Sequence, residues 1–313
     1  MTKTPILLDG NPTSLIEMLG DDFEIVSWTD QPDPAELARC VAVLSYSHPT
    51  CDGPLMDAMP NLKVISNYGV GVDHIDLQAA RKRGIPVGNT PGCLDASTAD
   101  MTMALILAVA RNVVIGDKYA HSSAYTHHDP SILIGHEVTG STLGIIGMGR
   151  IGKQVAKRAN GFDMRILYHN RNRDEEAERE LNVSYASLDD LLRESDFVAL
   201  NCPLTEETTG LIGDRELELM KPSAILVNLA RGPVVKTDAL YRALTSGTIA
   251  AAGLDVTDPE PLPRDHPLLE LENAIVLPHL GSASDRTRNR MAEMSVENLR
   301  AGLAGRELPY RVG

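Results

Sequence analysis

The sequence predicts an α/β protein built from two doubly wound parallel-sheet domains. Short apolar, β-prone segments alternate with helical segments along most of the chain, as βαβ units do. The chain has 313 residues, which is enough for two domains with separate hydrophobic cores. One β-prone segment, residues 143–146, is followed by a glycine-rich turn and a helical segment, the order found in dinucleotide-binding domains.

The composition limits the kinds of function. Apolar residues make up 43% of the chain and charged residues 23%, as in ordinary globular proteins. The formal net charge of −14 disfavours nucleic acid or an anionic membrane as a partner. The four cysteines form no C-x-x-C pair, so we expect reduced thiols in the cytoplasm. The longest apolar run, residues 101–110, is too short to span a bilayer, and no signal-peptide pattern opens the sequence.

The first third of the chain predicts a small parallel sheet. Strands are expected at residues 6–8, 23–26, 41–45 and 63–66, with helices at residues 12–19 and 54–59. The last of these strands leads into a loop that contains Gly69 and Gly71. Ligands meet a parallel sheet at the carboxyl ends of its strands, so the N–H groups of this loop are candidates for binding an anion. A plain turn is the alternative and the more common role of two isolated glycines.

The middle of the chain predicts a helix from about Ser97 to Ala110, apolar on all sides and therefore buried, at the connection between two domains. Residues 116–140 predict a helix followed by an irregular loop. This region contains three histidines, His121, His127 and His128. No carboxylate or cysteine completes a ligand set at helical spacing, so no metal site is expected.

The glycine-rich turn has the spacing G-x-G-x-x-G at Gly147, Gly149 and Gly152. In a dinucleotide site Gly147 permits the tight turn, Gly149 lets the backbone approach the pyrophosphate, and Gly152 lets the helix pack against the strand. The helix N-terminus offers free N–H groups and a positive dipole end to the phosphates. The motif alone is weak evidence, but strand, turn and helix follow in the required order, which predicts nucleotide binding.

The next predicted strand, residues 165–169, ends at Asn170, with Arg171 and Arg173 close behind. A carboxylate at this place accepts hydrogen bonds from the adenosine ribose and favours NAD(H). Here an amide takes its place, and guanidinium groups pair well with a 2′-phosphate. We therefore expect NADP(H) as the preferred cofactor, with NAD(H) as the alternative. A solvated turn beside Asp174 is the explanation that involves no ligand.

Further strands are predicted at residues 197–201, 224–228, 249–254 and 274–277, and a helix at residues 287–303. Arg231, Asp255 and His279 each follow closely on one of these strands. Carboxyl ends of parallel strands share one edge of a sheet, where a bound nicotinamide would lie. We expect these three side chains to meet at that edge.

These residues suit the reduction of a 2-keto acid, which needs a hydride donor, a group for the carboxylate and an acid for the keto oxygen. Arg231 offers a permanently charged guanidinium for the carboxylate. Histidine titrates near neutral pH, so His279 can donate the proton, and Glu260 would orient its ring. Each residue alone has an ordinary alternative, such as an ion pair or a surface carboxylate. Their convergence beside a nucleotide site favours catalysis.

At these residues the chain resembles the D-isomer-specific 2-hydroxyacid dehydrogenases, and within them the glyoxylate/hydroxypyruvate reductases. The resemblance covers nearly the whole length. The matching segments are residues 67–74 (NYGVGVDH), 98–100 (TAD), 143–152 (LGIIGMGRIG), 202–205 (CPLT), 228–232 (NLARG), 252–263 (AGLDVTDPEPLP) and 277–283 (LPHLGSA).

The resemblance implies NAD(P)H-dependent reduction of a small 2-keto acid, glyoxylate or hydroxypyruvate, to the D-2-hydroxy acid. It implies a flavodoxin-like substrate domain at residues 1–97 plus 285–313, a Rossmann cofactor domain at residues 98–284, and a homodimer. A cleft between the domains would close over the substrate.

The resemblance also implies residue roles. Arg231 would bind the carboxylate and keto oxygen, His279 would donate the proton, and Glu260 would orient His279. The substrate would also contact the backbone of Val70 and Gly71, and Ser282 would line the pocket. Arg150 and Ile151 would contact the pyrophosphate, and Asp255 the nicotinamide amide. The implied cofactor residues together are Thr98, Gly147, Gly149, Arg150, Ile151, Gly152, Asn170, Arg171, Cys202, Pro203, Thr208, Ala230, Asp255 and Gly281.

One departure concerns substrate choice. Members of the mammalian type carry tryptophans in the dimer-forming loop, where this chain has Tyr125, His127 and His128, and its single tryptophan is Trp28. A bulkier 2-keto acid, such as hydroxyphenylpyruvate or 2-ketogluconate, is therefore an alternative substrate.

A non-catalytic, NAD(H)-sensing corepressor-like protein is an alternative to an enzyme. The compact chain ends and Arg171 favour an enzyme over such a sensor.

Overall fold

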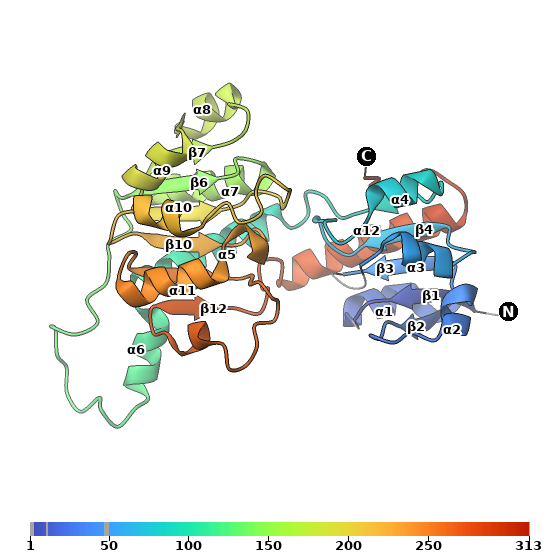
Figure 1. Cartoon of the computed structure of the whole chain (residues 1–313), viewed down its shortest axis with the longest axis horizontal. Helices are drawn as coiled ribbons and strands as arrows, with labels where there is room; N and C mark the ends of the chain where they lie inside the picture. The colour runs from blue at the N-terminus through green and yellow to red at the C-terminus, as the bar shows by residue number, and fades with distance from the viewer. Residues whose placement is uncertain (1–2, 11, 47–49, 313) are drawn as a thin grey trace. The chain divides into compact units, whose positions relative to one another are not determined.

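The structure is a computed structural model that describes residues 3–10, 12–46 and 50–312. The chain divides into two compact units, each with its own parallel sheet and covering helices (Figure 1). Unit 1 comprises Met1–Leu94 and Ala283–Gly313, and unit 2 comprises Asp95–Ser282.

Unit 1 has a five-stranded parallel sheet with the strand order β2-β1-β3-β4-β5. Leu7 of β1 pairs with Val26 of β2 and Val43 of β3, so the order reverses beside β1, as in flavodoxin-like sheets. The last helix, α12, returns to this unit and packs on β3, β4 and α1; Figure 1 draws it in red among the blue elements. The elements are β1 Thr4–Leu8, α1 Thr13–Leu19, β2 Phe23–Ser27, α2 Pro34–Arg39, β3 Ala42–Ser45, α3 Gly53–Ala58, β4 Val64–Asn67, α4 Leu77–Lys82, β5 Val87–Gly88 and α12 Asp285–Leu303.

Unit 2 has a seven-stranded parallel sheet with the strand order β12-β11-β10-β9-β6-β7-β8. Ile146 of β6 pairs with His169 of β7 and Leu200 of β9, so the order reverses at β6, as in Rossmann sheets. The elements are α5 Asp95–Ala110, α6 Val113–Ala120, β6 Thr142–Ile146, α7 Arg150–Ala159, β7 Arg165–His169, α8 Glu175–Leu181, β8 Val183–Tyr185, α9 Leu188–Glu194, β9 Phe197–Leu200, α10 Asp214–Leu219, β10 Ile225–Asn228, α11 Thr237–Ser246, β11 Ala251–Leu254 and β12 Ala274–Val276.

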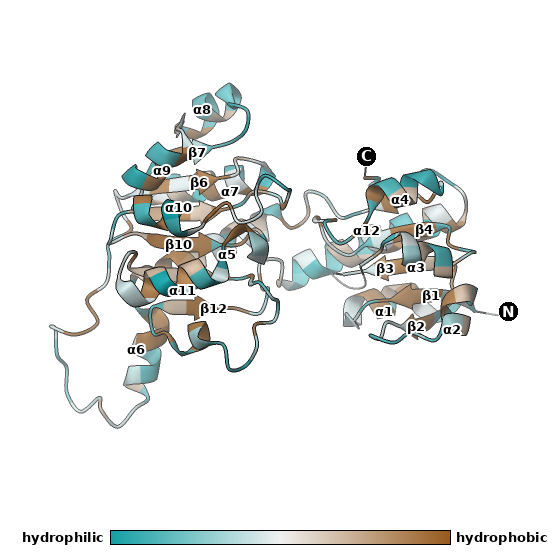
Figure 2. Ribbon diagram, viewed as in Figure 1, coloured by the Kyte–Doolittle hydropathy of each residue, from teal (hydrophilic) through white to brown (hydrophobic). Residues whose placement is uncertain are grey.

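The central strands of both sheets are buried along their whole length and are mostly apolar. Every residue of β3, β9 and β10 is buried. Helices on both faces of a parallel sheet exclude water from both sides of its strands, which therefore carry continuous apolar runs. Figure 2 shows the result as brown strands, such as β3 and β10, between helices that are teal on their outer sides.

The predicted fold class is confirmed, since two parallel-sheet α/β units are present. Each predicted strand forms, with bounds that differ from the prediction by no more than two residues. The prediction missed β5 and β8, which have two and three residues and are too short to show an apolar period.

One expectation about α5 is wrong. The helix begins at Asp95, and it is not buried on all sides, because Ala104 is exposed and Met101 and Leu107 are half-buried. One side of α5 packs on α7, β10 and β11 within unit 2. Small and apolar residues on the other side left no polar face from which its orientation could be inferred.

Across the described residues, no single helix has the length and apolar character to cross a membrane. The pair α5 and α6 passes a length and composition test together, but the two helices are bent by 58°. All four cysteines are free thiols, and three of them are buried.

Candidate active site

The glycine-rich loop after β6 is closed on its inner side and open at Gly149. Gly147 has a φ of 102°, and a Cβ there would lie 2.5 Å from the backbone nitrogen of Cys202. A Cβ at Gly152 would collide with the carbonyl oxygen of Gly147. A Cβ at Gly149 would meet no described atom within 4 Å. The loop is therefore shaped so that a ligand can approach its backbone at Gly149, as a pyrophosphate requires.

The N-terminus of α7 follows directly. Its first N–H groups have no partner within the helix, and Arg150 and Ile151 lie in this turn. Arg150 Nε is 3.6 Å from Asp95 Oδ2 at the start of α5. Burial raises the pKa of Asp95, and Arg150 opposes that shift. A helix N-terminus with an arginine beside it fits a phosphate group, and Asp95 is a neighbour that the sequence analysis did not single out.

The loop after β9 lies beside the glycine turn and carries Cys202, Pro203 and Thr208. Thr208 Oγ1 donates to the carbonyl of Pro203 at 2.7 Å, which closes this loop on itself. Burial raises the pKa of the Cys202 thiol to about 11, so it stays neutral. Both side-chain amide atoms of Asn201 are buried without a hydrogen-bond partner in the described part of the chain. Buried polar atoms usually have partners, and a bound dinucleotide would supply them at this edge.

The turn after β7 differs from the prediction in one respect. Asn170 Oδ1 accepts a hydrogen bond from the Met148 N–H at 2.7 Å, which ties this turn to the glycine loop. Arg173 forms two hydrogen bonds of 2.7 Å with the Glu178 carboxylate, so its charge is already paired. Arg171 is exposed and makes no hydrogen bond or ion pair with the described residues. Of the two arginines, Arg171 is therefore the one whose guanidinium is available to pair with a 2′-phosphate.

The carboxyl ends of β10, β11 and β12 hold the predicted catalytic residues. The strands β10, β11 and β12 end at Asn228, Leu254 and Val276, respectively. These three end residues are neighbours in the sheet, because Asn228 pairs with Leu254 and Leu254 pairs with Val276. The N–H of His279 donates to the carbonyl of Asp255 at 3.0 Å, and the N–H of Asp255 to that of Asn228 at 2.9 Å. These hydrogen bonds join the three strand ends into one edge.

His279 and Glu260 form the central pair. Nδ1 of His279 is 2.7 Å from Oε1 of Glu260, and the two side chains are 37% and 39% exposed. His279 has a φ of 56°, in the left-handed region that non-glycine residues rarely adopt. Such backbone outliers gather at functional sites. Because the carboxylate accepts the proton on Nδ1, Nε2 is the nitrogen that remains for a substrate.

Arg231 is positioned by Asn228, which the sequence analysis did not identify. The Asn228 amide accepts from the N–H of Ala230 at 2.9 Å and donates to the carbonyl of Arg231 at 3.0 Å. Arg231 Nη1 donates to the carbonyl of Ala230 at 2.9 Å. A Cβ at Gly232 would collide with the carbonyl of Thr257, so this turn packs tightly against the segment that leads to Glu260. A buried asparagine that ends a strand three residues before Arg231 is the signal in the sequence.

Asp255 is buried, and its carboxylate has partners within the protein. Its oxygens accept from the N–H groups of Leu280 at 2.6 Å and Gly281 at 2.8 Å. A Cβ at Gly281 would lie 3.4 Å from Thr98 Cγ2, so Thr98 also lies at this edge, and the next residue, Ser282, is buried. Asp255 thus fixes the turn that follows His279. A carboxylate has further acceptor capacity, and the contact with a nicotinamide amide stays a prediction.

The loop after β4 in unit 1 contains Val70 and Gly71. Asn67 Nδ2 donates to the carbonyl oxygens of Gly69 and Gly71, each at 2.9 Å, and Asn89 Nδ2 donates to that of Val70 at 2.8 Å. In a trans peptide the carbonyl and the following N–H point in opposite directions. The N–H groups that follow these carbonyls therefore point away from the asparagines, and they meet no acceptor among the described residues. Backbone N–H groups arranged in this way can bind a carboxylate.

The histidine-rich segment after α6 shows no such convergence. In the described ranges, no three His, Cys, Asp or Glu side chains are grouped closely enough to hold a metal ion. His121 Nδ1 lies 3.5 Å from Asp117, one turn earlier, and both side chains are exposed. Tyr125 is 51% exposed and packs its ring edge-on against Tyr119.

The two sheets and this arrangement define a nucleotide-binding α/β protein with a histidine–carboxylate pair and an arginine at one edge. Residues 103–281 match the model of the D-isomer specific 2-hydroxyacid dehydrogenase NAD binding domain. The chain belongs to the D-isomer specific 2-hydroxyacid dehydrogenase family, and unit 2 contains its NAD(P)-binding domain.

Three known proteins illustrate the relationship. The glyoxylate reductase of Korarchaeum cryptofilum is 48% identical over 305 residues, which cover 95% of this chain and 92% of that protein. The crystal structure of the TT0316 protein from Thermus thermophilus has a TM-score of 0.89 and 46% identity, covering 99% of this chain and all of that one. An NADPH-dependent glyoxylate/hydroxypyruvate reductase of Sinorhizobium meliloti, solved with NADP and malonate, has a TM-score of 0.89 and 33% identity, covering 100% of this chain and 97% of that one.

Proposed function

We propose that this protein reduces glyoxylate, and hydroxypyruvate beside it, to the D-2-hydroxy acid, with NADPH as the preferred hydride donor. The observation that carries the proposal is the His279–Glu260 pair at the strand edge that also holds Arg231. The names of the Korarchaeum and Sinorhizobium relatives support the choice of substrate.

The chemistry follows from the residues at that edge. A bound nicotinamide cofactor supplies the hydride that reduces C2 of the keto acid. Arg231 binds the substrate carboxylate and polarises the keto oxygen with its fixed positive charge. His279 Nε2 gives its proton to that oxygen as the negative charge develops there, and Glu260 stabilises the imidazolium beforehand and keeps Nε2 aimed at the substrate. We further propose that Val70 and Gly71 contribute to substrate binding through their N–H groups.

The test is an initial-rate assay of glyoxylate, hydroxypyruvate, hydroxyphenylpyruvate and 2-ketogluconate with NADPH and with NADH. We expect the two small acids to turn over fastest with NADPH. His279→Gln should lower kcat about 100-fold or more while the dissociation constant of NADPH stays unchanged. A preference for the bulky acids would overturn the substrate assignment, and an active His279→Gln variant would remove it as the proton donor.

The cofactor preference depends on Arg171, and the neighbouring arginine provides a matched control. Arg171→Ala should weaken NADPH binding about tenfold or more, since a charge-assisted phosphate contact is lost, and leave NADH binding nearly unchanged. Arg173→Ala removes an equal charge that Glu178 already pairs, so the NADPH-to-NADH ratio should not move. Equal losses for both cofactors in Arg171→Ala would refute the 2′-phosphate assignment.

We also propose a cytoplasmic homodimer. Six of the seven large apolar side chains that are exposed in the described residues lie between residues 113 and 134: Val113, Val114, Tyr125, Ile132, Leu133 and Ile134. Figure 1 shows this segment, α6 and the loop after it, extending away from the sheet of unit 2. Exposed apolar patches of this kind mark protein–protein contacts. Ile134→Glu should give a monomer in sedimentation analysis, and a wild-type monomer would refute the proposal.

A further inference from the structure

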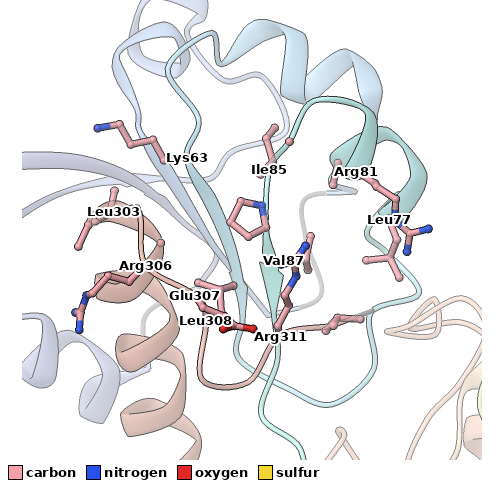
Figure 3. Close-up of a pocket in the computed structure, with 17 residues that line it drawn as sticks. Lys63, Leu77, Arg81, Ile85, Val87, Leu303, Arg306, Glu307, Leu308 and Arg311 are labelled. Atoms are coloured by element: carbon pink, nitrogen blue, oxygen red, sulfur yellow. The ribbon is translucent and has the colours of Figure 1, made fainter.

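Unit 1 contains a cavity of about 750 Å³ that the proposed reaction does not use (Figure 3). Its walls come from α4, from the residues that precede β4 and β5, and from the segment after α12. Lys63 lies just before β4 and Pro86 just before β5, so the cavity is at the amino edge of the sheet. The loop with Val70 and Gly71 follows the opposite, carboxyl end of β4. The cavity and the proposed substrate loop are therefore separate places within unit 1.

The charges around this cavity are the reverse of those of the whole chain. The chain has 29 Lys and Arg against 43 Asp and Glu. The cavity lining has four cationic side chains and one carboxylate: Lys63, Arg81, Arg306, Arg311 and Glu307. None of these four cations forms a side-chain hydrogen bond or ion pair with the residues that the structure describes. A local net excess of three positive charges in an acidic protein attracts anions.

Backbone contacts fix the main chain at three of these four residues, all of which are exposed. Lys63 donates its N–H to the carbonyl of Val41, in the neighbouring strand region, at 2.8 Å. Arg306 donates its N–H to the carbonyl of Ala301 at 2.9 Å, which fixes the turn that ends α12. Arg311 forms an antiparallel bridge with Gly88 of β5. Figure 3 shows Lys63 and Arg306 on one side of the cavity, Arg81 on the other and Arg311 between them. A main chain that is fixed before binding lowers part of the entropic cost of holding a ligand.

The remaining lining favours binding over chemistry. Val87, Ile85 and Leu308 are buried apolar residues that contribute to the wall. Among the described residues, the lining contains no histidine, cysteine, serine or threonine, and so no imidazole, thiol or hydroxyl group. The positive charge of Arg81 interacts favourably with the negative end of the helix dipole, which explains the position of this residue in the last turn of α4. It does not explain the other three cations, which lie outside helices.

We propose that this cavity is a binding site for a small organic polyanion, with two or more negative charges and an apolar portion. The anionic groups pair with Arg81, Arg306 and Arg311, and the apolar portion lies against Val87 and Leu308. Guanidinium groups suit planar carboxylates and phosphates because they donate two parallel hydrogen bonds. The occupant is an effector or a stabilising ligand rather than a substrate of the proposed reaction.

The test is calorimetric titration of the full chain with citrate, glycerol 3-phosphate and inorganic pyrophosphate at physiological salt, without cofactor. We expect at least one probe to bind with a dissociation constant below about 1 mM and to raise the thermal midpoint as ligand linkage requires. Arg81→Gln and Arg311→Gln should each weaken that binding about tenfold. Lys82→Gln is the matched control, because it removes the same charge from the adjacent helical position without lining the cavity.

Three outcomes would overturn the proposal: no binding of any probe, equal weakening in Lys82→Gln and Arg81→Gln, or loss of binding in Arg231→Gln. The second would mean that only the overall charge matters, and the third that the probe occupies the proposed substrate site. Because the readout is binding without turnover, the result does not depend on the proposed reductase activity.

Discussion

The loop after β6 in unit 2 and the loop after β4 in unit 1 both present N–H groups at the carboxyl end of a parallel strand, but they are built differently. The first relies on glycines and the start of α7. The second relies on the side chains of Asn67 and Asn89, which bind the carbonyls and so turn the N–H groups outward. The N–H groups at the start of a helix are exposed by local structure alone. The second loop also depends on Asn89, which comes after α4 in the chain.

The largest expected effect breaks the first loop. Gly149→Ala places a methyl group where the structure leaves open space, so the protein should fold normally while a pyrophosphate can no longer approach the backbone. We expect the dissociation constant of NADPH, measured by fluorescence titration, to rise about 100-fold with an unchanged thermal midpoint. Gly161→Ala, which also meets no atom within 4 Å, is the control and should alter neither value. Normal NADPH affinity in Gly149→Ala would show that the pyrophosphate lies elsewhere.

The difference between the loops also shows how far the sequence could be interpreted. The strands and the residues that follow them could be predicted from local patterns. In each case an apolar run is followed within a few residues by Gly147, Arg231, Asp255 or His279. The His279–Glu260 pair was expected on chemical grounds, and the structure gives its distance of 2.7 Å. The parallel-sheet α/β class followed from the alternation of elements, and the division into two domains from the length of the chain.

Contacts between residues distant in the chain could not be predicted in this way. Asn89 reaches the loop because β5 pairs with β4, and β5 is too short to detect. Glu178 neutralises Arg173 only because α8 turns back on the end of β7. Asn201 was overlooked because an asparagine after a strand is common in turns. In each case the residue is visible in the sequence, but its contact partner is determined by the tertiary fold.

The second prediction breaks the asparagine-built loop. Asn67→Ala removes the amide donor from the carbonyls of Gly69 and Gly71. The Gly69 carbonyl keeps the Thr90 N–H at 3.0 Å, but the Gly71 carbonyl loses its donor, at about 1–3 kcal/mol, which frees the loop to rotate. We expect the KM for the keto acid to rise at least about tenfold, while the dissociation constant of NADPH is unchanged, since unit 2 keeps its glycine loop. Asn61→Ala removes the same kind of contact, to the carbonyl of Ala38, and should leave KM unchanged. A matching loss of NADPH affinity in Asn67→Ala would mean that the two loops do not act separately.

A smaller effect is expected at Asn89, which holds a single carbonyl of the same loop. Asn89→Ala should raise the KM for the keto acid by about threefold to tenfold, because one hydrogen bond of about 1 kcal/mol is lost and Asn67 still holds the neighbouring carbonyls. Steady-state kinetics at saturating NADPH provide the measurement. If Asn89→Ala raised KM as much as Asn67→Ala, the carbonyl of Val70 would be the essential one.

The smallest effect concerns the amino end of β6, opposite the glycine loop on the same strand. Burial raises the pKa of Asp196, but the Lys221 ammonium at 2.7 Å and the Thr142 N–H at 2.9 Å outweigh it and hold that pKa below its usual value. A carboxyl group with a lowered pKa contributes stability above its unfolded pKa, and that contribution is lost as the pH falls through the folded pKa. Asp196→Asn should therefore lower the free energy of unfolding at pH 7 by about 1 kcal/mol or less, since more than a third of the pair is exposed.

Urea titrations should show this difference shrinking as the pH falls below about 4, the ordinary range of an aspartate, with NADPH affinity at pH 7 unaffected. Asp21→Asn, which breaks a more exposed pair with Lys3, should change the unfolding free energy even less. A change in NADPH affinity at pH 7 would show that the two ends of β6 are coupled.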